Sequence, residues 1–221
     1  KSLFTNGYNE LGKLQVKTFG PVSGPGGGPV DRLTYDYNIR GWLLGINRNY
    51  INSASTIAIT NAIPAPGNYF GEELAYDKLN SVSGMSFLYP QLNGNVAGTV
   101  WKSTGDAVNR KYDFTYDNAN RLTAANFAQI TPANAEILDF TVNLGYDANG
   151  NLGTLTRKGY RLGAPTSPVD QLTLNCLPAS NQLKNVIDVV NNPQTILGDF
   201  RTSQTYMTAL GGPKTIGAQD Y

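Results

Sequence analysis

The stretch YDANGNL, Tyr146 to Leu152, decides the fold, because it places an Asn-Gly dipeptide between two segments with the composition of strands. Asn149 and Gly150 suit the two positive-φ positions of a type I′ hairpin turn, which Gly adopts freely and Asn tolerates. With this pair at the centre of the turn, Tyr146 lies opposite Gly153, and a register shifted by one residue is the alternative. The stretch therefore predicts a β-hairpin.

The flanking segments have the pattern of two half-buried strands. LDFTVNLGYD (138–147) and NLGTLTRKGY (151–160) are rich in Thr, Val, Leu and aromatic residues at nearly alternating positions. Such alternation is typical of strands with one buried face and one solvated face. With 24 Gly, 12 Pro and only 15% charged residues, the composition also favours short elements joined by many turns. The expected fold class is all-β.

The same seven-residue pattern recurs along the chain, each time as a Tyr, then Asp or Asn, and a Leu six residues after the Tyr. Complete copies are YNELGKL (8–14), YNIRGWL (37–43), YDNANRL (116–122) and YDANGNL (146–152). The glycines of the first two lack the preceding Asn, so those turns need not be of type I′. The residues assigned a structural role in the repeat are Tyr8, Gly12, Leu14, Tyr37, Gly41, Leu43, Tyr116, Asp117, Leu122, Tyr146, Asp147, Asn149, Gly150 and Leu152.

Two weaker copies leave the number of hairpins open. Tyr76-Asp77 lacks a closing turn, and Asn181-Gln182-Leu183 has only the second half, with Cys176 near the place of the Tyr. Repeats at a spacing of roughly 30 to 40 residues indicate one supersecondary unit used several times. The uneven spacing is explained by loops that lengthen individual hairpins, expected at 20–29, 52–71 and 163–171.

Composition excludes several classes of function. The net charge is +1 and there is no long basic run, so no nucleic-acid partner is expected. No window approaches the ~20 apolar residues of a membrane span, so no membrane insertion is expected. The chain has no His and one cysteine, Cys176, which is interpreted as a small buried thiol because it has no imidazole base.

A calcium site is the alternative for YDANGNL. The spacing Asp147-x-Asn149-x-Asn151 resembles the start of an EF-hand loop. Such a loop needs Gly at its sixth position and a bidentate acid at its twelfth, where this chain has Leu152 and Lys158. An Asx-assisted turn is therefore preferred, and no metal or other cofactor is expected.

Catalysis by paired carboxylates is the remaining enzymatic alternative, with Glu72 and Glu73 adjacent in FGEEL. Asp77, Asp117 and Asp147 recur at equivalent repeat positions, whereas a catalytic acid is needed once. The recurring acids are therefore interpreted as structural, and no catalytic residue is assigned.

Trp42 and Trp101 are the candidate carbohydrate-binding residues, because flat aromatic rings stack on sugar faces. The preferred interpretation is that they pack across strands of the sheet.

Taken in order, YNIRGWL, LNGNVAG, WKS and YDNANRLTAANF resemble RHS or YD repeats, the tyrosine-aspartate repeats of bacterial secreted or wall-associated cell-surface proteins. The resemblance covers most of residues 7 to 190. It implies that successive β-hairpins join edge to edge into a curved, open antiparallel sheet, part of a shell that encloses or presents a C-terminal effector. It also implies that the partners are the remainder of the parent chain and its effector, with glycans as the alternative for an adhesion module.

On this resemblance, residues 1–221 are expected to form a single YD-repeat region, a fragment of a longer secreted or cell-surface chain. No effector and no self-cleaving closure segment are expected within it, so no protease function is carried over. Gln219-Asp220-Tyr221 resembles the approach to another repeat, and at least one exposed or chain-paired edge strand is expected.

Overall fold

The computed structural model of the 221-residue chain describes residues 3–20, 30–52, 69–78, 84–129, 138–161, 163–164, 166–190, 200–212, 214–215 and 217–218. Three features expected from the sequence lie wholly or mostly outside these residues: the glycine-rich loop at 20–29, the loop at 52–71 and the C-terminal 219–221.

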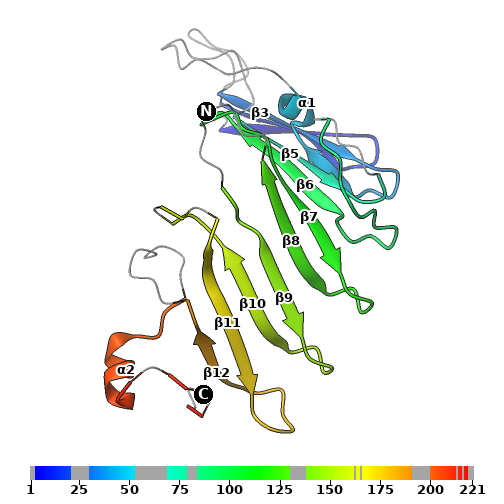
Figure 1. The fold of residues 1–221 in the computed structure, drawn as a ribbon. Coiled ribbons are helices and arrows are strands. Elements are labelled where there is room, and N and C mark those ends of the chain that lie inside the picture. Colours follow the sequence, from blue (N-terminus) through cyan, green and yellow to red (C-terminus); the bar gives the residue numbers. More distant parts are fainter. Residues whose placement is uncertain are drawn as a thin grey trace. The chain divides into compact units, whose positions relative to one another are not determined.

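The described residues contain twelve strands and two short helices, and the chain divides into two compact units, Lys1–Asp113 and Phe114–Tyr221 (Figure 1). The strands are β1 (Phe4–Tyr8), β2 (Leu14–Phe19), β3 (Asp31–Tyr37), β4 (Leu43–Ile46), β5 (Phe70–Ala75), β6 (Gly98–Ser103), β7 (Arg110–Tyr116), β8 (Leu122–Gln129), β9 (Val142–Tyr146), β10 (Leu152–Lys158), β11 (Pro168–Cys176) and β12 (Leu183–Asp188). The helices are α1 (Arg48–Asn52) and α2 (Gln204–Leu210).

The order of the strands in the sheet is their order in the chain, and consecutive strands pair antiparallel. Among the described strands, β1 and β12 each pair with one neighbour, so the sheet is open. The prediction of an all-β array of antiparallel hairpins in an open sheet is confirmed. The described strands form six hairpins, from β1–β2 to β11–β12, a number that the weak repeats left open.

The repeat turn is a three-residue loop, so the predicted type I′ turn is wrong. The Asp147 amide donates to the Asn151 carbonyl at 3.0 Å, and the Gly150 amide donates to the Asp147 carbonyl at 3.1 Å. Gly150 has φ +90°, whereas Asn149 is not among the residues with positive φ. This is the pattern of a type I turn followed by one left-handed residue, which needs a single permissive position where type I′ needs two.

With the longer loop, the hairpin adopts the register shifted by one residue that the sequence left open as the alternative. Tyr146 lies opposite Leu152 instead of Gly153, and one residue is left unpaired before Thr154 lies opposite Gly145. The same irregularity follows the closing Leu in every hairpin for which the pairing is described at this point. The aligned pairs are Tyr8 with Leu14, Tyr37 with Leu43, Tyr146 with Leu152 and Cys176 with Leu183.

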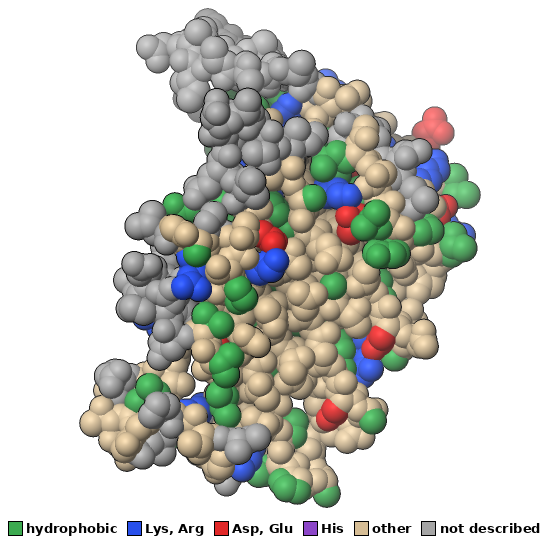
Figure 2. All heavy atoms as spheres, viewed as in Figure 1, with side chains coloured by type: hydrophobic (Ala, Val, Ile, Leu, Met, Phe, Trp, Pro, Cys, Tyr) green, Lys and Arg blue, Asp and Glu red, His purple; other side chains and the backbone are tan. Residues whose placement is uncertain are grey.

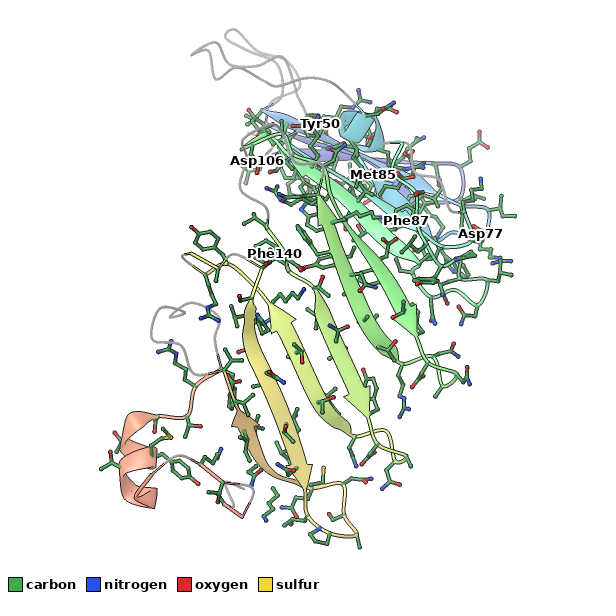
Figure 3. The ribbon with its side chains drawn as sticks, in the orientation of Figure 1. Tyr50, Asp77, Met85, Phe87, Asp106 and Phe140 are labelled. Carbon is green, nitrogen blue, oxygen red and sulfur yellow. The ribbon has the colours of Figure 1, made fainter. Side chains whose placement is uncertain are left out.

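The core of the first unit lies on one face of β5 and β6. It contains Ile51 of α1, Ala75 of β5, Val100 of β6 and two residues of the preceding segment, Phe87 and Ala97. Met85 packs against this cluster and is labelled with Phe87 in Figure 3. A Cβ at Gly98 would lie 2.5 Å from the Phe87 ring, so glycine is required for the ring to approach the strand.

In the second unit, β11 begins earlier than the sequence suggested. The predicted loop at 163–171 is wrong in its second half, because Pro168 opens β11 and Val169 is buried. Proline is tolerated as the first residue of a strand, so the Pro-containing segment did not exclude one. Beyond β12, α2 begins after Ser203, whose hydroxyl accepts from the Tyr206 amide, and ends at Gly211 with φ +73°.

Candidate functional site

In each repeat, the side chain of the Asp or Asn that follows the Tyr forms hydrogen bonds within its own turn. The Asp147 Oδ1 atom accepts from the amides of Asn149 at 2.9 Å and Asn151 at 2.8 Å. The equivalent residues of the other complete repeats accept the same two bonds, from the second and fourth residues after them. These residues are Asn9, Asn38 and Asp117. Four turns therefore share one Asx-stabilised structure.

In each of these turns, the residue three positions after the Asp or Asn has a left-handed backbone conformation. Its φ is +73° at Gly12, +79° at Gly41, +60° at Asn120 and +90° at Gly150. Asn120 shows that asparagine fills this position, which explains why the sequence alternates between Gly and Asn there.

We expect Gly150→Val to destabilise the protein by about 1 to 3 kcal/mol, because a β-branched residue is strained at φ +90°. Gly150→Asn is the matched control and should cost clearly less, as Asn120 adopts the same conformation. Asp147→Ala should also cost less than Gly150→Val. Thermal melts measure the three variants; equal losses in the Val and Asn variants, or a melting point that depends on calcium, would contradict the turn assignment.

The turn acids are held in their charged form. Hydrogen bonding lowers the pKa of Asp117 below its usual value, chiefly through the Arg121 amide. The pKa of Asp147 is lowered chiefly by the Asn151 side-chain amide. Asp139 also has a lowered pKa; partial burial acts to raise it, but the hydrogen bonds from Lys158 and Thr141 outweigh that effect.

Because these pKa values are lower in the folded state, their contribution to stability is present at neutral pH and is lost on acidification. We expect the unfolding free energy to be nearly constant above about pH 5 and to fall below about pH 4. The double variant Asp117→Asn, Asp147→Asn should keep its turns, as Asn9 and Asn38 do, and should lose less stability in acid. Urea denaturation at several pH values measures the unfolding free energy of both proteins. If this free energy fell as steeply with decreasing pH in the double variant as in the parent, the result would contradict the prediction.

The tyrosine of a repeat joins its hairpin to the preceding one. The Tyr37 hydroxyl donates to the Leu14 carbonyl at 2.9 Å. The same bond joins Tyr76 to the Leu43 carbonyl at 3.0 Å, and Tyr146 to the Leu122 carbonyl at 2.9 Å. Thus the first and last residues of the sequence pattern meet across neighbouring hairpins, a role that the sequence analysis did not assign.

The register at these junctions is constant. The strand pairings place Val16 opposite Thr34, Gly45 opposite Glu73, Ala124 opposite Asn143 and Thr154 opposite Thr173. In every case the first residue lies two after the closing Leu. Continued by two residues, each ladder places that Leu opposite the residue just before the next Tyr, or before Cys176 in the last junction. Cys176 therefore occupies a tyrosine position, as the sequence suggested.

The residue before the closing Leu makes a third recurrent contact, toward the next hairpin. The ammonium of Lys13 lies 5.2 Å from the centre of the Tyr37 ring and donates to the Gly41 carbonyl at 2.9 Å. Arg121 lies 4.7 Å from the centre of the Tyr146 ring and donates to the Asp147 carbonyl. Cations over aromatic faces and hydrogen bonds to the next turn both stabilise the contact between neighbouring hairpins of the sheet.

Trp42 occupies this same position in the second repeat. Its ring centre lies 5.1 Å from that of Tyr76, and Arg40 lies over its face at 5.1 Å. Trp101, in β6, stacks on Tyr112 of β7 at 5.4 Å. Both indoles are therefore partly buried in contacts within the sheet, which favours the packing interpretation over a sugar platform.

The two adjacent carboxylates of FGEEL do not form a pair. Alternation along β5 directs Glu72 and Glu73 to opposite faces. Glu73 is buried and binds Arg48 at 2.6 Å, whereas Glu72 accepts from the Thr99 hydroxyl at 3.0 Å. They therefore do not converge on one reacting atom.

In the repeat turns, both carboxylate oxygens of Asp147 accept hydrogen bonds. Asp147 Oδ1 accepts two backbone bonds and Oδ2 accepts from the Asn151 side chain at 2.8 Å. Among the residues that the structure describes, no three acidic or cysteine side chains are grouped as a metal ion requires.

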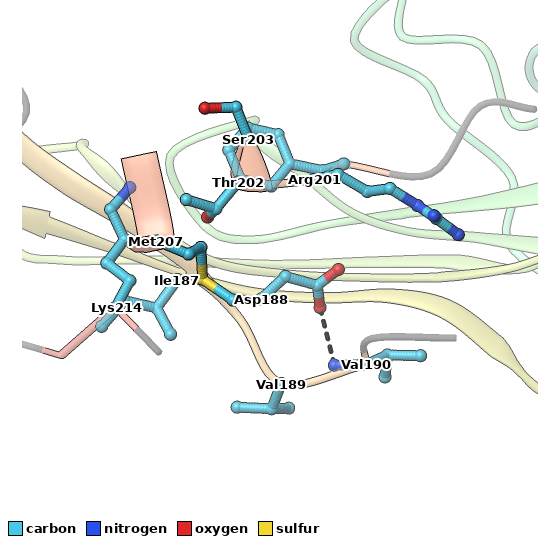
Figure 4. A pocket seen from close by; sticks show the side chains of 10 residues that line it. Ile187, Asp188, Val189, Val190, Arg201, Thr202, Ser203, Met207 and Lys214 are labelled. Atoms are coloured by element: carbon cyan, nitrogen blue, oxygen red, sulfur yellow. Dashed lines mark hydrogen bonds between the residues drawn. The ribbon is translucent and has the colours of Figure 1, made fainter. Parts of the chain in front are cut away.

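One hollow of the described residues lies away from the repeat turns, and another adjoins one of them. A cavity of about 530 Å³ lies between the end of β12 and α2, lined among others by Asp188, Arg201 and Lys214 (Figure 4). Asp188 accepts there from the Val190 amide at 2.9 Å and the Gln171 amide at 3.0 Å, so its carboxylate organises the end of the strand. A second cavity of about 430 Å³ adjoins the turn at 38–41 and has the Arg48–Glu73 ion pair in its wall.

The face of the molecule in Figure 2 carries its hydrophobic side chains in small groups separated by polar and backbone atoms. Within the described part of the chain, no helix is both long and apolar enough to cross a membrane.

Compared with models of known protein families and with curated proteins, the sequence matches none.

Proposed function

We propose that the chain is a non-catalytic structural module, a stretch of hairpins in the wall of an RHS-type shell of a secreted or surface protein that encloses or presents a C-terminal effector. The observation that carries this proposal is the use of the repeat residues. The Asx residues bind their own turns, and Tyr37, Tyr76 and Tyr146 donate to the carbonyls of preceding hairpins. The recurring residues therefore act either in closing a hairpin or in joining it to the preceding one.

The geometry of the junctions supports a wall. One register is repeated at four of the five junctions between the described hairpins. The tyrosine bond is repeated at three of them, so these hairpins present the next one with the same edge. A ladder of this kind extends by addition of identical units, as in other repeat proteins in which each unit contacts its neighbours. Several of the described acids are engaged in ion pairs, such as Asp170 with Arg157 and Asp139 with Lys158.

A glycan array tests the proposal against an adhesion function. We expect the chain to bind no glycan on the array, and the variants Trp42→Ala and Trp101→Ala to behave alike. Glycan binding that disappears in either variant, with an unchanged circular dichroism spectrum, would contradict the purely structural role. The sequence of the parent gene on both sides provides the complementary test, since an effector-type C-terminal domain is expected downstream.

A further inference from the structure

The sequence contains three Asn-Gly pairs, which are Asn6-Gly7, Asn93-Gly94 and Asn149-Gly150. Asparagine is a chemically labile residue, above all before glycine, because the unhindered backbone nitrogen of the glycine can attack the side-chain carbonyl carbon. All three asparagines are exposed to water, so exposure does not distinguish them. They differ in whether the glycine amide, which must lose its proton before it attacks, already donates a hydrogen bond.

In two of the pairs the glycine amide is engaged in a backbone hydrogen bond. The Gly150 amide donates to the Asp147 carbonyl at 3.1 Å within the repeat turn. The Gly20 amide donates to the Leu3 carbonyl at 3.0 Å, which makes these residues a hydrogen-bonded pair of the β1–β2 ladder. Because such pairs alternate along an antiparallel ladder, Gly7 also bonds to β2. Opening of a backbone bond must therefore precede attack by either nitrogen.

The pair in the segment before β6 is different. Among the residues that the structure describes, none accepts a hydrogen bond from the Gly94 amide. The Asn93 Oδ1 atom accepts from the Asn95 amide at 3.1 Å. This bond holds the side-chain carbonyl against its own backbone, and it polarises that carbonyl as a donor in an oxyanion hole does. The electrophile is thus activated and the attacking nitrogen is not engaged.

We propose that Asn93 is a site of spontaneous modification, at which the folded chain forms a succinimide and then aspartate or isoaspartate, while the same dipeptide in the repeat turn is preserved. The Gly94 amide loses its proton to a base of the solvent, and its nitrogen bonds to the Asn93 Cγ atom. The Cγ–Nδ2 bond breaks, and Nδ2 takes up a proton and leaves as ammonia. Water, the only other reactant, then opens the ring at either carbonyl and gives the α-linked or the β-linked product.

The modification changes the segment that covers the core of the first unit. A carboxylate replaces an uncharged amide, so the net charge falls by one unit from +1. The β-linked product also lengthens the main chain by one carbon directly before Gly94, where a Cβ would lie 3.0 Å from the Trp42 indole. Phe87 and Ala97 of the core belong to the same segment. The change therefore falls on a connection between hairpins and spares the repeat turns.

Incubation of the folded full chain at mildly alkaline pH, followed by proteolysis and mass spectrometry, compares the three pairs in one sample. We expect deamidation at Asn93 to be about tenfold faster than at Asn6 or Asn149, the factor that corresponds to opening one hydrogen bond. In concentrated urea the three sites should react at similar rates, because no glycine amide is then engaged. Each site is a control for the others, since all three share one molecule.

Asn93→Gln and Asn149→Gln are the matched variants. Glutamine would have to form a larger ring, which closes more slowly, so Asn93→Gln should remove most of the acidic species that accumulates on isoelectric focusing. Asn149→Gln should leave that species unchanged. Equal rates at the three sites of the folded chain, a faster reaction at Asn149, or a rate at Asn93 that rises on unfolding as much as the other two would overturn the proposal. The inference is independent of the proposed structural function, and none of these results bears on glycan binding.

Discussion

Glu73→Ala is expected to destabilise the protein by about 3 kcal/mol or more, whereas Glu72→Ala, one residue earlier in the same strand, should cost less than about 1 kcal/mol. The Glu73 side chain is 5% exposed and binds Arg48 at 2.6 Å. Its removal leaves the Arg48 guanidinium, itself 22% exposed, with only Asp36 at 3.7 Å among its described acidic neighbours. An uncompensated charge in a poorly solvated position is the costly state.

Urea denaturation of the two alanine variants measures this difference, with circular dichroism to establish that each folds. Glu72 is the matched control because it shares the strand and the charge but accepts from Thr99 on the other face. Equal losses in the two variants would contradict the assignment of Glu73 to a buried ion pair.

Phe87→Ala is expected to cost about 3 to 5 kcal/mol, the range for removal of a buried aromatic ring. The Phe87 side chain is 2% exposed and belongs to the cluster with Ile51 and Val100. It lies over Gly98, where no side chain competes for the space, and Lys111 lies 5.8 Å from its ring centre.

The neighbouring Leu88 provides the control for this second variant. It is 57% exposed, so Leu88→Ala should change the unfolding free energy by less than about 0.5 kcal/mol. Chemical denaturation of both variants decides; a loss at Phe87 as small as that at Leu88 would mean that the segment 84–97 is not part of the core.

Much of the fold could be predicted because its signals are local. Alternating Thr, Val and aromatic residues around Asp147 predict strands, and the recurring Asp or Asn with Gly predicts the turns between them. The turn type was predicted wrongly because Asn-Gly is compatible both with type I′ and with a loop in which only Gly150 is left-handed. One residue of loop length decides between them, and the sequence carries no mark of it.

The junctions and the core depend on contacts between distant residues, which repeat spacing alone does not specify. The spacing of six residues between Tyr and Leu predicts one turn, but it does not show that the Tyr side chain binds another hairpin, as Tyr146 does at the Leu122 carbonyl. Glu73 and Phe87 bear no repeat signature, and their burial follows from the covering of one sheet face by α1 and residues 84–97.

The most direct test of the central claim, that the repeat tyrosines are hairpin junctions, is the unfolding free energy of the variants Tyr37→Phe, Tyr76→Phe and Tyr146→Phe against Tyr8→Phe. Each substitution removes one hydroxyl and nothing else. The account predicts a loss of about 1 kcal/mol for each of the first three, which donate to the carbonyls of Leu14, Leu43 and Leu122, and no measurable loss for the exposed Tyr8. Equal effects at all four positions, or none at the three junctions, would contradict it.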